Sequence, residues 1–391
     1  YNMVDTIIVG RTISVEALAA VGAAGAITFL IVGFALGFTN GLSIIVAQRF
    51  GANDMDGVRR SVGTGLILAA MASVVLTAVS MLSARSLLQF MHTPDNIIND
   101  SYNYIIVIYA GIVFQVFYNY ISCVIRALGD SRTPLYFLLI SSIINIILDL
   151  VFILNFHMGV AGAAISTLVS RIFCAVVVLY QLRKDRQPIV VRDYLKIRPD
   201  GKMIGRILAL GIPSGIENSM FQLGKLAIQS TVSTLGTAAI AANAVTNILE
   251  NLNGVAAQGV GIGLMTIVGQ CIGAGRKDEA IYYIKKLSKM AEAAIIISCL
   301  VVFALCRPIT ILGGMEAESA RMCFEMTLFI TITKPISWVL SFIPAYGMRA
   351  AGDVKFSMIT SCASMWLCRV SFTIFLCRAV SYTHLRAHET G

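Results

Sequence analysis

The chain has 391 residues, of which 57% are hydrophobic and 13% are charged, and its formal net charge is +9. A soluble domain carries about 25% charged residues, so this composition excludes an ordinary water-soluble domain. The apolar residues come in blocks of roughly 20 to 30, the length that an α-helix needs to cross a bilayer. The sequence therefore predicts an all-α integral membrane protein with many crossings.

Eleven apolar blocks follow one another along the chain. The first, residues 1–10, is interpreted as the tail end of a partial helix. The other ten, each expected to be a membrane-spanning helix, cover residues 17–48, 62–83, 102–125, 134–155, 159–182, 203–234, 238–270, 290–306, 322–348 and 354–378.

Residues 183–202 form the longest polar stretch and predict a cytoplasmic linker between two transmembrane bundles, 1–182 and 203–378. Residues 379–391 have no apolar period and resemble a non-native tail, so they are excluded from the fold prediction.

The two bundles resemble each other in sequence. A shift of 222 residues aligns the segment 17–56 with the second half without a gap, and RALGD at 126–130 meets RAAGD at 349–353 at a shift of 223. An even number of crossings per repeat makes both halves enter the membrane in the same direction. We therefore expect two six-helix bundles related by a pseudo-twofold axis along the membrane normal, with the last helix missing and the binding site near the midplane.

Basic residues gather in loops on alternate sides of successive blocks. Of the 30 Lys and Arg residues, 20 lie in these loops, in the polar stretch around 183–206 and at four shorter sites. The positive-inside rule places these loops in the cytoplasm. The net charge thus reports topology, and we expect no nucleic-acid partner.

The sequence offers little support for an enzyme. It contains no GxxxxGK[ST] phosphate loop, so ATP is not expected as the energy source. No His is placed to activate an intramembrane nucleophile. The nine cysteines are scattered singly, which favours small buried side chains over a disulfide framework or a zinc site.

Asp149 lies in the middle of the apolar run SIINIILDLVFIL, residues 142–154. An ionisable side chain at this depth is costly, so by default it faces a cavity, a partner or an ion. Asn145 lies one turn earlier on the same helical face. The pair predicts a functional polar cluster inside the first bundle.

Several motifs in order resemble the multidrug and toxic compound extrusion (MATE) family of transporters. In the first half they are NMVDTIIVG, EALAAVG, VAQRFGAND, RALGDSRTP, NIILDLVFI and GVAGAAISTLVS. In the second half they are LGIPSGIENSMFQLGKL, AAIAANAV, VGQCIGAGR and MRAAGD, and the likeness runs from Asn2 to about Arg378.

The resemblance implies a twelve-helix secondary antiporter, working as a monomer in the plasma (inner) membrane of a bacterium. Such proteins export mainly cationic, amphipathic small molecules in exchange for Na⁺ or H⁺, with no cofactor besides this coupling ion. Residue by residue, it implies that Asp5, Asn145, Asp149 and Thr167 bind the coupling ion. Their oxygens would serve as ligands for Na⁺, or a carboxyl would carry a proton.

The chain departs from the family pattern at three positions. The family often has Pro after the fifth-helix Asp, where this chain has Leu150. One branch carries carboxylates in its second half at the positions of Phe221 and Trp338. A coupling site of that second kind is not expected here.

Other intramembrane polar residues have two interpretations each. Asn145 and Thr167 also suit an interhelical hydrogen-bond staple. Glu217 and Lys225 lie on one face of the seventh helix, where they line a substrate path or form a static pair. Tyr118 offers a cation–π face to a substrate or belongs to a lipid-interface belt, the interpretation that we favour. Lys334 is interpreted as snorkelling towards an interface.

The alternative function is that of a related flippase for a lipid-linked oligosaccharide or a peptidoglycan precursor. Such a protein is expected to have a cavity rich in Arg and Lys for the pyrophosphate. The mid-helix charges of the first half are chiefly acidic, with Arg171 the exception. A scaffold without transport activity would leave Asp149 without a reason.

Overall fold

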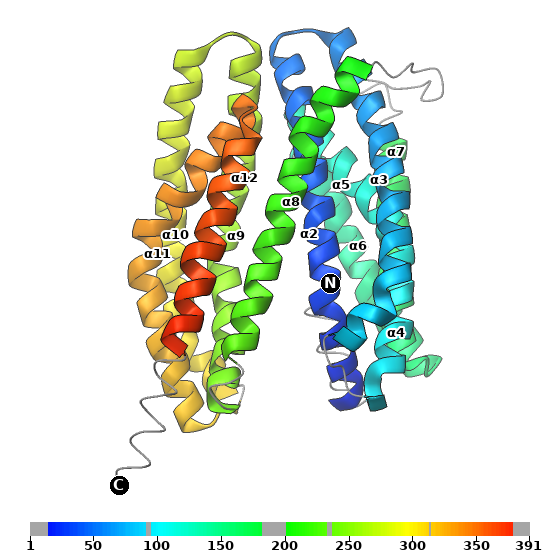
Figure 1. Cartoon of the computed structure of the whole chain (residues 1–391), viewed down its shortest axis with the longest axis vertical. Coiled ribbons are helices and arrows are strands. Elements are labelled where there is room, and N and C mark those ends of the chain that lie inside the picture. Colours follow the sequence, from blue (N-terminus) through cyan, green and yellow to red (C-terminus); the bar gives the residue numbers. More distant parts are fainter. Residues whose placement is uncertain (1–14, 91–94, 182–200, 233–236, 313, 378–391) are drawn as a thin grey trace. The chain divides into compact units, whose positions relative to one another are not determined.

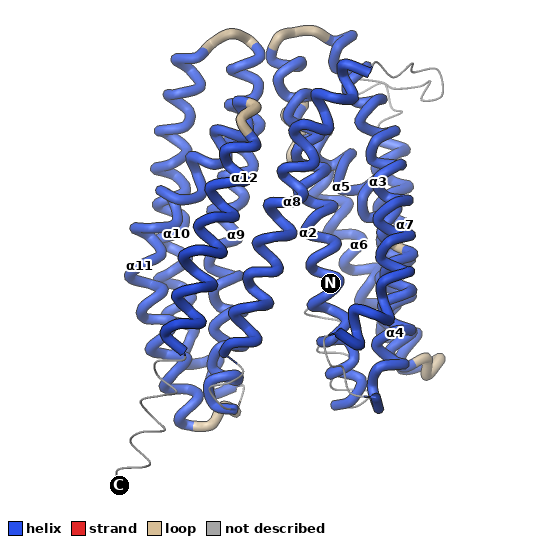
Figure 2. Tube along the Cα trace, in the orientation of Figure 1, coloured by secondary structure: helices blue, strands red, loops and turns tan. Residues whose placement is uncertain are grey.

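The structure is a computed structural model that describes residues 15–90, 95–181, 201–232, 237–312 and 314–377. Within these ranges all regular structure is helical, as the tube trace shows (Figure 2). Asp5, most of the linker 183–202 and the tail 379–391 lie outside the described residues.

Eleven α-helices and two π-helical segments make up the described chain (Figure 1). The first six are α2 (Val15–Gly51), α3 (Met55–Phe90), α4 (Asp95–Ala110), α5 (Ile112–Ala127), α6 (Arg132–Leu150) and α7 (Gly159–Gln181). The others are α8 (Gly201–Val232), α9 (Thr237–Gly273), α10 (Lys277–Leu312), α11 (Ala317–Ala351) and α12 (Val354–Ala363). The π segments η1 (Val151–Asn155) and η4 (Ser364–Val370) continue α6 and α12.

Eight of the described helices are long and apolar enough to cross a membrane. The block predicted as one span at 102–125 is instead a pair, α4 and α5, bent by 43° at Gly111. Counting this pair as one broken span gives nine. Helix α8 is not among the eight, because its polar residues make it less apolar than the other long helices.

The chain divides into two compact units, Tyr1–Gln222 (unit 1) and Leu223–Gly391 (unit 2). The division falls inside α8, because the first part of this helix packs closely on α2. A Cβ built on Gly41 would lie 2.6 Å from the Cα of Gly211, so only small residues allow this approach. The bundle boundary at 202/203 and the pseudo-twofold axis stay predictions.

The internal repeat predicted from the sequence is visible in the local geometry of corresponding turns. Gly129 after α5 and Gly352 after α11 both have φ of +97°. Asn53 after α2 and Gly275 after α9 also pair, with φ of +57° and +74°. Left-handed backbone suits Gly and, less well, Asn, which explains these residue types at the helix ends.

The helices that follow two of these turns begin in the same way. Asp130 Oδ1 accepts a hydrogen bond from the amide of Thr133 at 3.1 Å, and Asp353 Oδ1 accepts one from the amide of Phe356 at 3.2 Å. A side-chain oxygen that accepts from the amide three residues on is the usual N-cap contact. The two halves of the repeat therefore share the capping hydrogen bond of these turns as well as their amino-acid sequence.

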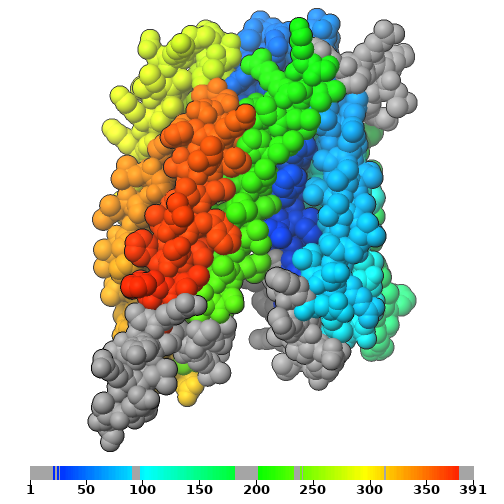
Figure 3. All heavy atoms as spheres, in the orientation of Figure 1, coloured from blue at the N-terminus to red at the C-terminus, as the bar shows by residue number. Residues whose placement is uncertain are grey.

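Within each unit the helices are close-packed, as the space-filling view shows for one face (Figure 3). In unit 2, α9, α10 and α11 pack on one another, and in unit 1, α2 packs on α3, α4 and α5 while α6 packs on α7. Large apolar side chains such as Leu82, Ile311 and Leu340 are 85%, 77% and 74% exposed, which suits a surface in lipid. The nine cysteines are free in the structure, and six of them are buried.

Candidate functional site

A stripe of polar side chains runs along one face of α6. Ser141, Asn145 and Asp149 follow one another at intervals of four residues, and each is 0% exposed. Residues on the other side of this helix, such as Ile143 and Ile147, are 59% and 54% exposed. The predicted shared face of Asn145 and Asp149 is confirmed, and this face points into unit 1.

Helix α7 runs antiparallel to α6 and covers this stripe. Three hydrogen bonds fix the register of the two helices. They run from Cys174 Sγ to the Phe137 carbonyl at 3.6 Å, from Ser141 Oγ to the Ser170 carbonyl at 2.9 Å, and from Ser166 Oγ to a carboxylate oxygen of Asp149. The register places Asn145 between the levels of Ser170 and Ser166.

The amide of Asn145 has no hydrogen-bond partner among the described residues. Both its Nδ2 and its Oδ1 are buried. The hydroxyl of Ser170 on α7 is also buried and has no hydrogen-bond partner among the described residues. An unsatisfied buried polar group costs about 1–3 kcal/mol, so such groups are uncommon without a functional reason. The interpretation of Asn145 as an interhelical hydrogen-bond staple therefore finds no partner for it in the described part of the chain.

Of the four residues implied as the coupling site, Asn145 and Asp149 lie on the face of α6 that α7 covers. Thr167 is 2% exposed on α7, next to Ser166, the residue that donates to Asp149. The fourth, Asp5, lies outside the described residues. Sequence reasoning missed the contact from Ser166, although the four-residue spacing from Ser166 to Ser170 mirrors the polar stripe on α6.

A distortion of the helix follows Asp149 directly. The π segment η1 begins at Val151, and the amide of Phe156 donates to the Val151 carbonyl at 3.2 Å, five residues back. Single π-helical turns inside helices occur frequently at functional sites. The family's Pro is absent here, yet the structure still departs from α-helical geometry one residue after Leu150.

Three other predicted residues lie on α8 and α5. Glu217, on the part of α8 that belongs to unit 1, is 5% exposed. Lys225, on the part of α8 in unit 2, is exposed. Tyr118 Oη donates to the Pro134 carbonyl at 3.1 Å and so ties α5 to the start of α6.

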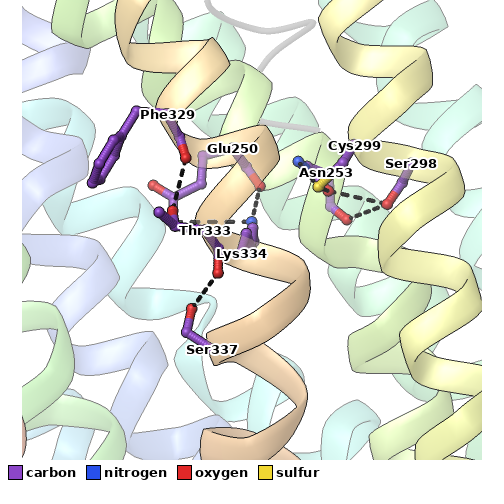
Figure 4. A network of polar contacts seen from close by, with 8 residues as sticks. All are labelled: Glu250, Asn253, Ser298, Cys299, Phe329, Thr333, Lys334 and Ser337. Carbon is purple, nitrogen blue, oxygen red and sulfur yellow. Dashed lines mark hydrogen bonds and ion pairs between the residues drawn. The ribbon is translucent and has the colours of Figure 1, made fainter.

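Lys334 on α11 is 8% exposed, so it does not snorkel outward as the sequence suggested. Its ammonium donates to the Glu250 carbonyl of α9 at 3.0 Å and lies 4.0 Å from Glu250 Oε1 (Figure 4). The two residues are 84 positions apart in sequence, which is why no local pattern reveals the contact.

A second buried asparagine lies in unit 2, close to the ion pair. Asn253 on α9 donates through Nδ2 to Cys299 Sγ at 3.0 Å, and its Oδ1 accepts from Ser298 Oγ at 3.0 Å (Figure 4). Its backbone carbonyl also accepts from Ser298 Oγ, at 2.9 Å. These contacts join α9 to α10 and leave the amide satisfied.

Across the described residues, buried side-chain oxygens and nitrogens without a hydrogen-bond partner occur in unit 1 and not in unit 2. Besides Asn145 and Ser170, they include atoms of Thr77, Tyr109, Asn119 and Ser122. No group of three His, Cys, Asp or Glu side chains that could hold a metal occurs in this part of the chain.

Comparison with known proteins gives a consistent result. The MatE family model matches residues 1–151 and 213–375. "Probable multidrug resistance protein YoeA" of Bacillus subtilis is 30% identical over 376 residues, covering 93% of this chain and 80% of that protein. "Probable multidrug resistance protein YpnP" of the same organism is 27% identical over 376 residues, covering 95% and 83%.

A crystal structure of MATE in the straight conformation matches with a TM-score of 0.88 at 22% identity, covering 97% of this chain and 84% of that one. This likeness confirms the fold, and the family model together with the Bacillus relative settles the family. The chain belongs to the MatE family of multi-pass membrane transporters.

Proposed function

We propose that the protein is a secondary antiporter in a bacterial plasma membrane, exporting cationic or amphipathic compounds in exchange for Na⁺ or H⁺. The observation that carries the proposal is the complete burial of Asp149 at the interface of α6 and α7, where Ser166 donates to its carboxylate. A carboxylate without access to water is retained only where it has a partner or binds a cation. The multidrug resistance names of the Bacillus relatives support the substrate class.

Asp149, Asn145 and Thr167 act together as the coupling site in this proposal. Asp149 supplies the negative charge, while the Asn145 amide and the Thr167 hydroxyl supply neutral oxygens of the kind that Na⁺ prefers. If the ion is H⁺, the carboxyl itself binds it. The unsatisfied Asn145 amide supports the proposal, because an ion or its water would complete the hydrogen bonds that the described residues leave unmade.

The energy for export comes from the concentration gradient of the coupling ion and from any net inward movement of charge. Each net positive charge that moves inward down a potential of 100 mV releases about 2.3 kcal/mol, whereas one-for-one exchange with a monovalent cation moves no net charge and is driven by the ion's concentration gradient alone. This energy drives export only if the ion and the exported compound favour opposite-facing conformations, because a ligand shifts a conformational equilibrium by its differential affinity alone. Binding at Asp149 therefore has to bias one of two states of the protein.

The orientation in the membrane follows from the basic turns. Arg49 precedes the α2–α3 turn, and Arg126 and Arg132 flank the α5–α6 turn. The helices alternate in direction, so these two turns lie at the same end of unit 1 and are the cytoplasmic end in our proposal.

The test is transport of a fluorescent cation by purified protein in liposomes, with Na⁺ and pH gradients imposed separately. Asp149→Asn keeps the size of the side chain but removes its charge, and we expect it to abolish the response to the coupling gradient. Asp100→Asn, which changes an exposed carboxylate of α4 in the same unit, is the matched control and should transport normally. Undiminished ion-driven transport by Asp149→Asn would refute the proposal.

A further inference from the structure

Three side-chain positions of α9 form a stripe beside Lys334. Glu250, Gly254 and Gln258 follow one another at intervals of four residues and therefore share a helix face. A Cβ built on Gly254 would lie 3.7 Å from Lys334 Nζ and 3.5 Å from Gln258 Nε2. The missing side chain of Gly254 thus leaves space between an ammonium and an amide, both of which are hydrogen-bond donors.

The ammonium of Lys334 retains donor capacity. It carries three N–H groups, and the described residues accept one of them, at the Glu250 carbonyl. Glu250 Oε1, at 4.0 Å, is beyond hydrogen-bond distance. An oxygen placed beside Gly254 would therefore meet N–H groups that are not yet engaged by the protein.

Three basic side chains act on one another near this space. Lys334, Lys225 and Arg369 are within electrostatic range of one another, and Glu250 is a carboxylate that acts on Lys334 and Lys225. Lys225 and Arg369 are exposed, whereas Lys334 is buried, so an anion beside Lys334 would meet a poorly hydrated cation. Gly254 itself is buried, but Glu250 is 37% exposed and Gln258 is exposed, so a ligand would reach Gly254 from one of these two neighbouring positions.

We infer that unit 2 holds a binding site for a carboxylate group, formed by the Lys334 ammonium, the Gln258 amide and the space above Gly254. Its ligand is the acidic end of an amphipathic compound, and the identity of that ligand rests on the proposed export function. The protein would then bind zwitterionic compounds. Lys334 and Gln258 in unit 2 would recognise the acidic end, for which the carboxylate of Asp149 is unsuited.

The experiment uses two dyes that differ by one group. Rhodamine B has a free carboxylate at pH 7, whereas its ethyl ester has none, and binding of each to the purified protein is measured by fluorescence anisotropy without an ion gradient. We expect Lys334→Gln to weaken binding of the acid by about 10-fold, the worth of a charge-assisted hydrogen bond, and to leave the ester within about 2-fold. Wild-type protein that does not bind the acid, or does not distinguish it from the ester, overturns the inference.

A second pair of variants covers the case in which Lys334→Gln fails to fold. Gly254→Ala adds a methyl at ordinary contact distance, so the fold should persist while the space for a carboxylate oxygen is filled and the acid binds more weakly. Gly259→Ala adds a methyl that meets nothing within 4 Å and is the control. Equal behaviour of these two variants toward rhodamine B would contradict the site.

Two further measurements separate this inference from the proposed function. Glu250→Gln removes a competing carboxylate and should tighten binding of the acid but not of the ester, an effect that a purely structural role would not produce. Asp149→Asn should leave the ratio of acid to ester binding unchanged. If ion-driven transport fails while this ratio still depends on Lys334, the antiport proposal is wrong and the carboxylate site stands.

Discussion

The two most deeply buried asparagines of the described chain show how the same residue can have opposite surroundings. Asn145 in unit 1 and Asn253 in unit 2 are 0% and 1% exposed. The amide of Asn253 is bonded to Cys299 and Ser298, whereas the amide of Asn145 has no partner among the described residues. Burial alone therefore does not identify a functional residue, but burial together with unmade hydrogen bonds is informative.

The repeat sharpens this contrast. At a shift of 223 residues, Asp149 and Asn145 correspond to Phe372 and Cys368, which are both exposed. The corresponding turns have kept the same backbone angles, so the fold requires the turns. It does not require a carboxylate at the position of Asp149, which agrees with the proposed role of Asp149 in ion coupling.

The largest effect is expected when the unpartnered amide is removed. Asn145→Leu keeps the branched shape of the side chain, with larger terminal groups, and deletes two polar atoms that bond to nothing in the described protein, so stability should hold or rise. If the amide serves the coupling ion, the ion concentration for half-maximal transport should rise at least about 10-fold. Thermal melting and liposome transport measure the two quantities, and normal coupling with lowered stability would show that Asn145 is structural.

The matched change in unit 2 should have the opposite outcome. Asn253→Leu breaks the contacts with Ser298 and Cys299, and we expect a loss of about 1–2 kcal/mol of stability, since interhelical hydrogen bonds in membranes are individually modest. Ion coupling should be unchanged. Reaction of the buried cysteines with a thiol dye during heating measures unfolding. An unchanged melting profile would contradict the stabilising role of the Asn253 contacts between α9 and α10.

The sequence predicts the helices well, because hydrophobic blocks of membrane length leave few alternatives. It also predicted the repeat, whose turns at Gly129 and Gly352 have the same φ. The bend at Gly111 was missed, because one glycine inside an apolar run is a weak signal. The π segment after Leu150 was missed for a similar reason, since the run VFILN contains neither Gly nor Pro.

The site was only partly predictable. The spacing of Asn145 and Asp149 on one helix is a local property, and the structure confirms it. The donation from Ser166 to Asp149 and the contact of Lys334 with Glu250 depend on which helices are neighbours and in what register. Periodicity within a single helix carries no information on either of these contacts.

The smallest effect concerns the corresponding turns after α2 and α9. In the first turn, Asp54 accepts from the Gly57 amide at 2.8 Å and pairs with Arg49 at 2.8 Å. These contacts, the Gly57 amide foremost, hold the pKa of Asp54 below its ordinary value of 3.8. In the turn after α9 the corresponding residue is Arg276, which has no carboxylate to titrate.

Because the pKa of Asp54 is lowered in the folded protein, its contribution to the turn is complete above about pH 3.8 and is lost as the pH falls below that value. Hydrogen exchange of residues 55–60, corrected for intrinsic rates, should therefore show protection that declines in acid. The effect should be small, since both partners are more than a third exposed and solvent screens the pair. Asp54→Asn keeps an oxygen for the Gly57 amide but cannot titrate, so its protection should vary less with pH than that of the wild type. An identical acid decline in both proteins would assign the effect to another group and remove this difference between the two turns.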